Sequence, residues 1–585
     1  MDTPTGGWFH PQVASFQPPP RALVNLLFAG ALLRLIGLGF HSLWLDEGAT
    51  WSWAVKETWG GTIFAEANHP PAWWVVTRAW IEAFGDSASS LRAPAGILGL
   101  VSIYLAYLLG LRLLDPLRRP QRGGFDRTPD DGRGAKQAVW FAGFVALSTY
   151  FTEYAQEARM YSALIAQAFG LSLLYLRWLD RNDRASLIGY ALLAALSLYT
   201  QYFAIWIICG HAAHATLLWW RQRGTATPFD LRPFAMACIG AGLLFVPWFL
   251  YLVGNYEGIS TGEAFNPFTR LFYVLWRIGA GPGLVVVDRP RLEEGIGAVL
   301  QEEAVMAAVT SLLWFGPIVV GVRFIAKQPG LRSFVAANVL VPIALLLLVF
   351  PFFALIHERY LVFLAPWLCL LAIVGALEAS RAVRPYLIAG LGLLLALGLV
   401  AYHGARMELV AVDISQPLGN VRVPKRFDPD PGDPIRVLHH GHPFGKEPWR
   451  QAHEWIMRYA RPEPAGDMRG DLVLMHPPYL HLVWDFYDRE TLDLAFLPRE
   501  TVDEAAIEAL LDEELKQRDR IFLILAHEET RDADGQKDPD YYFTLLRGLI
   551  GRRWWEEGME RYQVVEPILF NLSWGVRVAV FNRRG

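Results

Sequence analysis

Two neighbouring acids, Asp46 and Glu47, interrupt the apolar and aromatic stretch HSLWLDEGATWSW at 41–53. They come directly after the first strongly hydrophobic run of the chain. Ionisable groups at the edge of a membrane are usually functional or paired, and a carboxylate held near an incoming hydroxyl is the simplest general base. Each acid on its own could also be the ordinary polar start of a loop.

Three arginines stand at the ends of hydrophobic runs: Arg92 in SLRAPAG, Arg159 in YFTEYAQEARMY and Arg359 in HERYLVFLAP. A guanidinium group can hold a phosphate through two parallel hydrogen bonds. If the three arginines converge on one side of the membrane, they predict a phosphate-binding site. Glu153 and Glu157 lie close to Arg159 in the sequence, so a structural ion pair is the alternative for that arginine.

A metal site finds little support in the sequence. His69, before Pro70-Pro71, and His357, beside Glu358, could bind a divalent metal together with the acids, but their separation matches no known ligand spacing. The chain also lacks the glycine-rich phosphate loops of nucleotide-binding folds. We therefore assign no metal ligands and no cofactor, and leave a divalent metal open.

The composition places these residues in a membrane protein. Hydrophobic residues make up 53% and charged residues 19% of 585 residues, which predicts a multi-span α-helical chain. The formal net charge is −4, so nothing suggests a nucleic-acid partner.

Eleven hydrophobic runs are long enough to cross a bilayer. They lie at 22–40, 91–112, 137–152, 161–176, 185–203, 204–220, 232–253, 303–323, 333–353, 361–378 and 385–403. With these spans, the basic loops after Asp115 and at 177–184, 221–224, 323–332 and 378–384 share one side, which should be cytoplasmic. The amino terminus is then cytoplasmic too, and 41–90 forms a long external loop in which 69–85 is an interfacial helix.

This topology brings the polar motifs together on the outer face.

After Tyr402 the sequence becomes rich in proline, histidine and charge, which predicts a second, extracytoplasmic domain at 404–585 following a transmembrane domain at 1–403. Short β-branched runs such as DLVLMH, IFLILAH and VRVAVF, with helical patterns such as EPWRQAHEWIMRYA, favour an α/β fold there.

Six motifs in order carry a family resemblance: SLWLDE, HPPAWW, LRAPAGILGL, EYAQEARMYSAL, LSLYTQYFA and HERYLVFLAP. Over about 22–403 the chain resembles the polyprenyl-phosphate-sugar-dependent GT-C glycosyltransferases, which include protein O-mannosyltransferases and lipid A aminoarabinose transferases. The resemblance implies an enzyme of the bacterial inner membrane that moves a sugar from a lipid-phosphate carrier to an extracytoplasmic acceptor. The acceptor, which could be a glycolipid, a glycan or a protein, is not indicated.

The resemblance also implies roles for individual residues. Asp46 corresponds to the family's loop carboxylate, the base of an inverting displacement, with Glu47 as its neighbour. Arg359 corresponds best to the arginine that meets the carrier phosphate, followed by Arg92 and Arg159. The other polar residues expected around the donor and acceptor are His69, Glu153, Glu157, Tyr161, Tyr202, His357 and Tyr360.

Two other functions fit many of the same features. A lipid-carrier transporter or flippase also needs many spans and lipid-facing arginines, but its polar groups should reach both membrane faces. A ligase that moves a preassembled glycan from a diphosphate carrier would differ in its donor rather than in its fold.

Overall fold

A computed structural model describes most of the helical part of the chain and segments of the carboxyl-terminal part. The described residues are 20–120, 122–125, 132–225, 228–256, 267–282, 284, 296–353, 358–406, 411–412, 421–422, 449–460, 470–476, 478–488, 491–497, 509, 518, 520–525, 562–569 and 577–583. His357, and most of the segment after residue 406, lie outside these residues.

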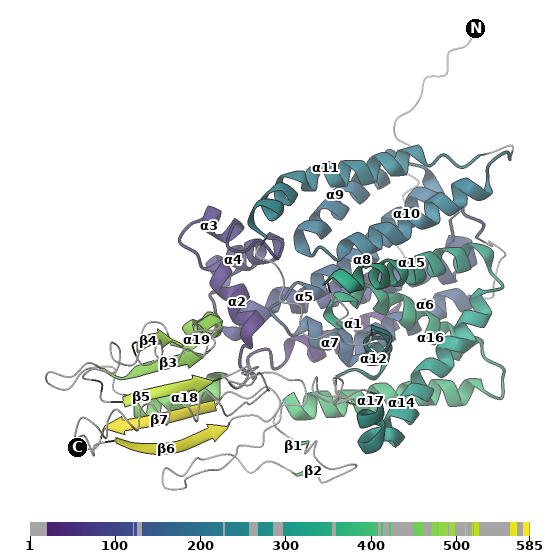
Figure 1. Ribbon diagram of the computed structural model, residues 1–585. Helices are drawn as coiled ribbons and strands as arrows, with labels where there is room; N and C mark the ends of the chain where they lie inside the picture. The colour runs from purple at the N-terminus through teal and green to yellow at the C-terminus, as the bar shows by residue number, and fades with distance from the viewer. Residues whose placement is uncertain are drawn as a thin grey trace.

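Long apolar helices pack into one bundle (Figure 1). Its helices are α1 (Arg21–Leu35), α5 (Ala88–Leu114), α6 (Arg133–Leu147), α7 (Thr149–Ala155), α8 (Tyr161–Arg181), α9 (Arg184–Thr200), α10 (Ala204–Arg221), α11 (Arg232–Asn255), α12 (Pro267–Ala280), α14 (Ile296–Ile325), α15 (Pro329–Phe353), α16 (Ala365–Glu378) and α17 (Arg384–Arg406). Every run predicted to span is helical. Because each helix satisfies its own backbone hydrogen bonds, it can lie in lipid.

Six described helical stretches are long and apolar enough to cross a membrane by length and composition: Ala88–Leu114, Tyr161–Arg181, Arg232–Asn255, Ala307–Ile325, Pro329–Val349 and Arg384–His403. The helices α9 and Val362–Glu378 are apolar but shorter. The predicted total of eleven spans therefore stays a prediction. The helix α4 (Ala72–Phe84) has 13 residues, about 20 Å, which is too short to cross.

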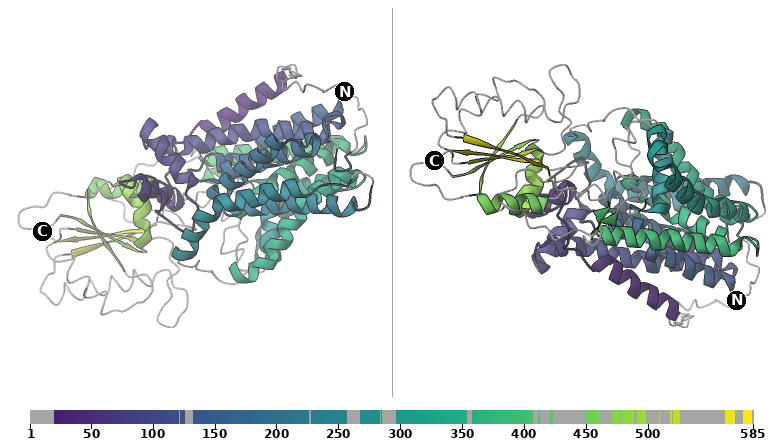
Figure 2. Two further views of the ribbon diagram at one scale, coloured as in Figure 1. Left: turned by 90° about the horizontal axis from the view of Figure 1, so that it is seen from above. Right: turned by 90° about the horizontal axis from the view of Figure 1, so that it is seen from below.

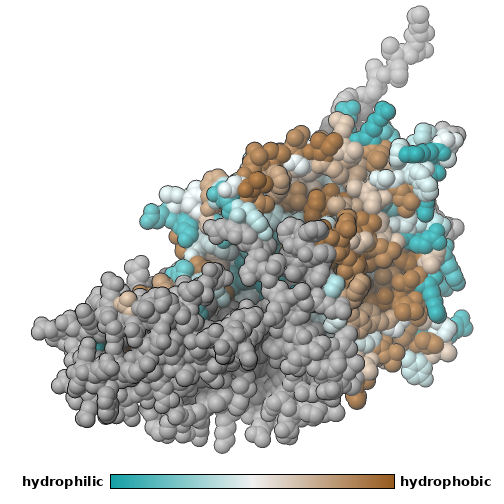
Figure 3. Space-filling view, viewed as in Figure 1, coloured by the Kyte–Doolittle hydropathy of each residue, from teal (hydrophilic) through white to brown (hydrophobic). Residues whose placement is uncertain are grey.

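The outside of the bundle is apolar, as a lipid-facing surface requires. Figure 3 shows hydrophobic side chains over much of the visible helical surface, with hydrophilic ones gathered towards its edges. On α11, Met236, Leu243 and Leu250 are each at least 66% exposed. Exposed apolar patches of this extent mark a surface that meets a partner or lipid.

The carboxyl-terminal part contains a mixed five-stranded sheet in the order β4-β3-β5-β7-β6. Its strands are β3 (Leu472–His476), β4 (Asp493–Phe496), β5 (Arg520–Leu525), β6 (Tyr562–Leu569) and β7 (Arg577–Arg583). Parallel pairing joins β3 to β4 and to β5, whereas β7 is antiparallel to both β5 and β6. β3, β5 and β7 coincide with the three predicted strand runs, and α18 (Trp449–Tyr459) with a predicted helix. The predicted domain boundary at 404 stays a prediction.

Three short helices of the loop after α1 lie at one end of the bundle, next to the sheet (Figures 1 and 2). They are α2 (Leu45–Ala54), α3 (Trp59–Ile63) and α4. α2 carries both acids of the LDE motif, so the site is built where the bundle meets the carboxyl-terminal part of the chain.

Candidate active site

The first turn of α2 presents its two acids to different surroundings. Successive residues of an α-helix point about 100° apart. Asp46 and Glu47 therefore face different neighbours although they are adjacent in the chain.

Glu47 makes a buried ion pair with Arg92 of α5. Arg92 Nε donates to Glu47 Oε1 at 2.7 Å and Arg92 Nη2 donates to Glu47 Oε2 at 2.6 Å, with side chains 1% and 0% exposed. Glu47 also accepts from the backbone N–H of Ala158 at 2.7 Å and from that of Trp44 at 3.4 Å. The second bond caps α2, since residue 44 precedes its first turn.

Arg92 uses all its donors within the protein. A guanidinium group has five N–H bonds. Two go to Glu47, and the other three reach the carbonyls of Leu38 (2.6 Å), His41 (3.1 Å) and Ser42 (2.7 Å). The predicted roles of Arg92 in phosphate binding and of Glu47 in catalysis do not fit this geometry. Both side chains instead fix α2 and the chain that enters it.

Asp46 lies on the open side of α2 and meets two arginines. Arg359 Nη1 lies 2.5 Å from Asp46 Oδ2, and Arg159 Nη2 lies 3.9 Å from the same oxygen. Arg159 Nη1 also donates to the Asp46 carbonyl and to Thr50 Oγ1, both at 3.1 Å. The side chains of Asp46 and Arg359 are 28% and 26% exposed, against 3% for Arg159. An acid that can meet solvent thus stands beside a fixed cation and a partly open one.

An aromatic ring holds Arg359 in place. Its guanidinium carbon lies 4.8 Å from the centre of the Trp44 ring, which is a cation–π contact. Arg359 belongs to the short helix η2 (Glu358–Tyr360).

A second cluster of charges continues from Arg359. Arg277 of α12 pairs with Glu153 at 2.9 Å and with Glu358 at 3.3 Å, and it also donates to the Tyr273 hydroxyl at 3.2 Å. Arg277 is a site residue that was not predicted from the sequence. Its signal is an arginine on the amphipathic helix FTRLFYVLWRIGAGPG, four residues after a tyrosine, which is a pairing distance on a helix.

His69 borders the same site in a neutral form. The loss of hydration on burial and then the positive charge of Arg159 lower the pKa of His69 to about 4, although Asp46 acts in the opposite direction. The His69 ring lies 5.8 Å from that of Trp53, and among the described residues its buried Nδ1 atom has no hydrogen-bond partner. His69 therefore offers a neutral imidazole to whatever occupies the site.

Three predicted tyrosines line different parts of this region. Tyr161 is buried at the start of α8, within the electrostatic reach of Arg359, Arg159 and Asp46. Burial raises the pKa of Tyr360, so that phenol stays protonated at neutral pH. Tyr202 lies between α9 and α10, where its hydroxyl donates to the Ala67 carbonyl at 2.8 Å and accepts from Trp248 Nε1 at 2.8 Å.

Glu157 and His357 complete the set of predicted residues. Glu157 is buried, and its charge acts on Arg92. His357 is not among the described residues. Within the part of the chain that the structure describes, no three histidine, cysteine, aspartate or glutamate side chains are grouped so that they could hold a metal ion.

The carboxyl-terminal part of the chain packs against the helix that carries the acids. α19 (His481–Tyr487) lies on α2, and a Cβ atom on Gly48 would lie only 2.4 Å from Val483 Cα. The Leu43 amide donates to the Tyr487 hydroxyl at 2.6 Å, and the rings of Trp51 and Phe486 meet edge to face at 5.5 Å. These contacts therefore help to set the position of α2.

Comparison with solved structures shows a fold that this chain shares with ArnT. The apo crystal structure of ArnT from Cupriavidus metallidurans aligns with a TM-score of 0.51 at 12% identity, covering 95% of this chain and 97% of ArnT. ArnT bound to undecaprenyl phosphate aligns with a TM-score of 0.48 at 14% identity, covering 96% and 98% of the two chains. An Archaeoglobus fulgidus oligosaccharyltransferase gives 0.45 at 13% identity, covering 86% of this chain and 67% of its own. No protein-family model and no curated protein sequence matches the chain.

Proposed function

We propose that this protein is an integral membrane glycosyltransferase that moves a sugar from a polyprenyl-phosphate carrier to an acceptor at the Asp46 end of the bundle. The observation that carries this proposal is the convergence of Arg359 and Arg159 on one oxygen of Asp46, at 2.5 and 3.9 Å. A base and a phosphate-binding cation are the two groups that such a transfer needs, and here they lie side by side.

Asp46 is the proposed base. The acceptor hydroxyl attacks the anomeric carbon of the sugar, and the bond from that carbon to the phosphate oxygen breaks with its electron pair remaining on the phosphate. Asp46 takes the hydroxyl proton as the new bond forms. Attack from the side opposite the leaving phosphate inverts the anomeric configuration.

Arg359 and Arg159 are the proposed partners of the leaving phosphate. Charge develops on the phosphate oxygen as the bond breaks, and guanidinium groups already held in place stabilise it without reorganisation. Trp44 and Thr50 hold the two arginines. When a phosphate binds Arg359, the ion pair between Arg359 and Asp46 opens, and the Asp46 carboxylate can then face the acceptor.

The neutral His69 and the phenols of Tyr161 and Tyr360 are proposed to surround the sugar. None of them adds a net charge, so they can form hydrogen bonds to sugar hydroxyls without competing for the phosphate. We further propose that this end faces the outside of a bacterial inner membrane, as the distribution of basic loops suggests.

Donor turnover by the purified full chain tests the proposal. A panel of labelled polyprenyl-phosphate sugars is incubated with wild type, Asp46→Asn, Arg359→Ala and the control Glu57→Gln, which removes an exposed carboxylate from the same loop. We expect transfer or release of one sugar by wild type and the control, and loss of turnover in the other two variants. Full activity in Asp46→Asn would remove Asp46 as the base.

The same experiment separates the other two functions. A transporter would bind a carrier without turning it over in any variant. A diphosphate-carrier ligase would use only donors with two phosphates, so matched donors with one and two phosphates belong in the panel.

A further inference from the structure

A cavity opens between the far ends of α5 and α8. Both helices begin beside the Asp46 site, where Arg92 and Tyr161 lie, and both run to the opposite end of the bundle. The cavity has a volume of about 380 Å³. Its lining consists of Leu108, Leu111, Arg112, Arg118, Leu173, Leu174, Arg177, Asp180 and Arg181.

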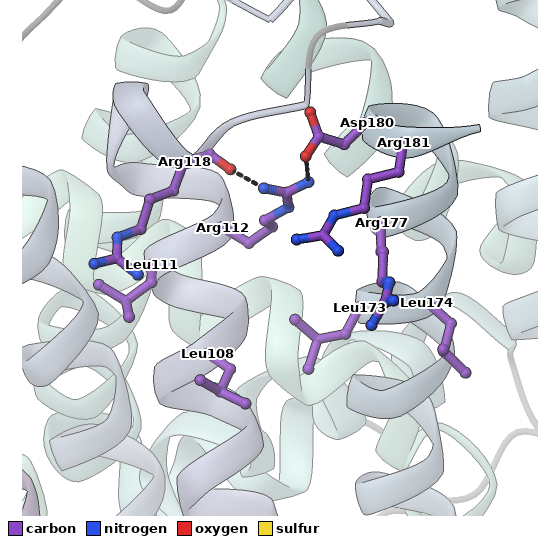
Figure 4. A pocket seen from close by; sticks show the side chains of 9 residues that line it. All are labelled: Leu108, Leu111, Arg112, Arg118, Leu173, Leu174, Arg177, Asp180 and Arg181. Atoms are coloured by element: carbon purple, nitrogen blue, oxygen red, sulfur yellow. Dashed lines mark hydrogen bonds and ion pairs between the residues drawn. The ribbon is translucent and has the colours of Figure 1, made fainter. Parts of the chain in front are cut away.

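The lining divides into an apolar floor and a basic rim (Figure 4). Leu108, Leu173 and Leu174 each come about one turn before an arginine of the same helix, so they lie deeper in the bundle, and Leu111 directly precedes Arg112. The arginines surround the mouth, at the helix ends where lipid headgroups would lie. A cavity with an apolar floor and a basic rim fits an amphiphilic molecule whose polar end points outward.

Positive charge dominates the rim. Four guanidinium groups face a single carboxylate, Asp180, among the lining residues. Asp180 Oδ2 forms an ion pair with Arg112 Nη2 at 2.7 Å, and Arg112 also donates to the carbonyl of Arg118. Arg112 thus ties the ends of the two helices together, and the side chains of Arg118, Arg177 and Arg181 form the rest of the rim.

The ion pairs of two of these arginines, Arg118 and Arg177, are weak enough to exchange. Arg118 lies 3.2 Å from Asp115 and Arg177 lies 3.7 Å from Asp183, with the two arginine side chains 55% and 52% exposed. Asp183 is already engaged as the cap of α9, accepting from Ser186 at 2.8 Å. Exposed pairs of this kind contribute little, whereas a phosphate offers guanidinium groups charge-assisted, bidentate bonds.

We propose that this cavity binds an anionic phospholipid of the leaflet opposite the Asp46 site. Its phosphate lies on Arg118, Arg177 and Arg181, and the upper part of an acyl chain lies on the leucine floor. Basic pockets between membrane helices recognise lipid headgroups in this way. The lipid would join α5 and α8, the two helices that carry Arg92 and Tyr161 at their other ends.

Native mass spectrometry of the full chain in neutral detergent tests the assignment. Phosphatidylglycerol and phosphatidylcholine with identical acyl chains are titrated against wild type, against Arg177→Gln/Arg181→Gln, and against the control Arg221→Gln/Arg223→Gln. The control removes two exposed charges at the end of α10, which the cavity does not include.

We expect wild type and the control to bind one phosphatidylglycerol at least tenfold more tightly than phosphatidylcholine. The cavity variant should lose roughly ten- to thirtyfold in phosphatidylglycerol affinity, since each arginine near a headgroup contributes about fivefold. Equal affinity for the two lipids in wild type, or an equal loss in the control, would overturn the proposal in favour of diffuse surface charge.

Two further arms separate a lipid from a free phosphate. Glycerol phosphate carries the headgroup chemistry without acyl chains, and we expect it not to displace phosphatidylglycerol at equal concentration; displacement would mean a free-anion site. Leu174→Asn places a polar group on the floor and should weaken phosphatidylglycerol binding while the protein keeps its elution volume. Unchanged lipid binding in that variant would contradict a seated acyl chain.

Discussion

Two arginine–carboxylate pairs on adjacent residues of α2 have opposite characters. The Glu47–Arg92 pair is excluded from solvent, and Arg92 has committed all five of its N–H bonds to protein acceptors. The side chains of the Asp46–Arg359 pair are each about a quarter exposed, and Arg359 Nη1 lies 2.5 Å from Asp46 Oδ2. A buried pair with all its bonds made can hold a helix in place, whereas an exposed pair can be opened by a ligand.

The difference follows from the surroundings rather than from the residue types. Taking a charge out of water is costly unless its hydrogen bonds are replaced, and the carbonyls at the end of the first hydrophobic run replace them for Arg92. The carbonyls of Leu38, His41 and Ser42 point at one guanidinium because the chain turns there before α2 begins. The Asp46–Arg359 pair, called the open pair below, also depends on this turn, because the turn sets where α2 starts.

Removing the buried carboxylate should have the largest effect. Glu47→Gln leaves the Arg92 charge in the interior without its counter-charge, which costs about 3–5 kcal/mol. We expect a sharp fall in the yield of folded protein and in the melting temperature, measured in detergent by size exclusion and thermal unfolding. Asp46→Asn is the matched control one residue away, and it should unfold like wild type. Equal stability of the two variants would contradict the claim that the Glu47–Arg92 pair holds α2 in place and the Asp46–Arg359 pair does not.

The open pair should reveal itself in turnover instead. Asp46→Asn keeps the size of the side chain but removes the proton acceptor. We therefore expect kcat to fall by about 10²–10⁴-fold, which is the usual contribution of a general base to the rate. Donor binding, measured by equilibrium titration of the carrier, should change much less. A loss confined to donor binding would instead make Asp46 an anchor for Arg359.

The contact between α2 and α19 should rank next. In Gly48→Ala the new methyl group meets Val483 Cα at 2.4 Å, and a backbone atom cannot rotate away. Overpacking of this kind costs about 1–3 kcal/mol. Because α2 carries both acids, we expect the overpacking to disturb both ion pairs. The melting temperature and kcat should both fall.

Gly60→Ala is the control for that change, because its nearest neighbour, Thr58 Oγ1, lies 3.8 Å away and leaves room for a methyl group. If Gly48→Ala behaved like Gly60→Ala, the carboxyl-terminal domain would have no part in setting the position of α2.

The sequence predicted the region of the site but not which acid faces it. Hydrophobic runs identify membrane helices because lipid leaves the backbone few other structures, and the LDE, EARMY and HERY motifs were correctly expected to come together. One step along a helix turns a side chain by about 100°, so the separate fates of Asp46 and Glu47 depended on the register of α2. Arg92 is 45 residues from Glu47, and their pairing depends on a turn with no sequence signature. Arg277 was missed because an arginine on an amphipathic helix usually faces solvent.

Acidification should produce the smallest effect, and only on the open side of α2. Since the pKa of His69 is lowered from 6.5 to about 4, the unfolded chain binds a proton there before the folded protein does. His69 therefore adds nothing to the pH dependence above about pH 6.5, and the free energy of unfolding falls as the pH drops from there towards 4. Partial exposure of the ring limits the loss to about 1 kcal/mol. Thermal unfolding of wild type and His69→Gln at pH 7 and pH 5 measures the difference: wild type should lose more stability than the variant. Parallel losses would mean that His69 is hydrated in the folded protein and that the open side of α2 is wetter than its contacts indicate.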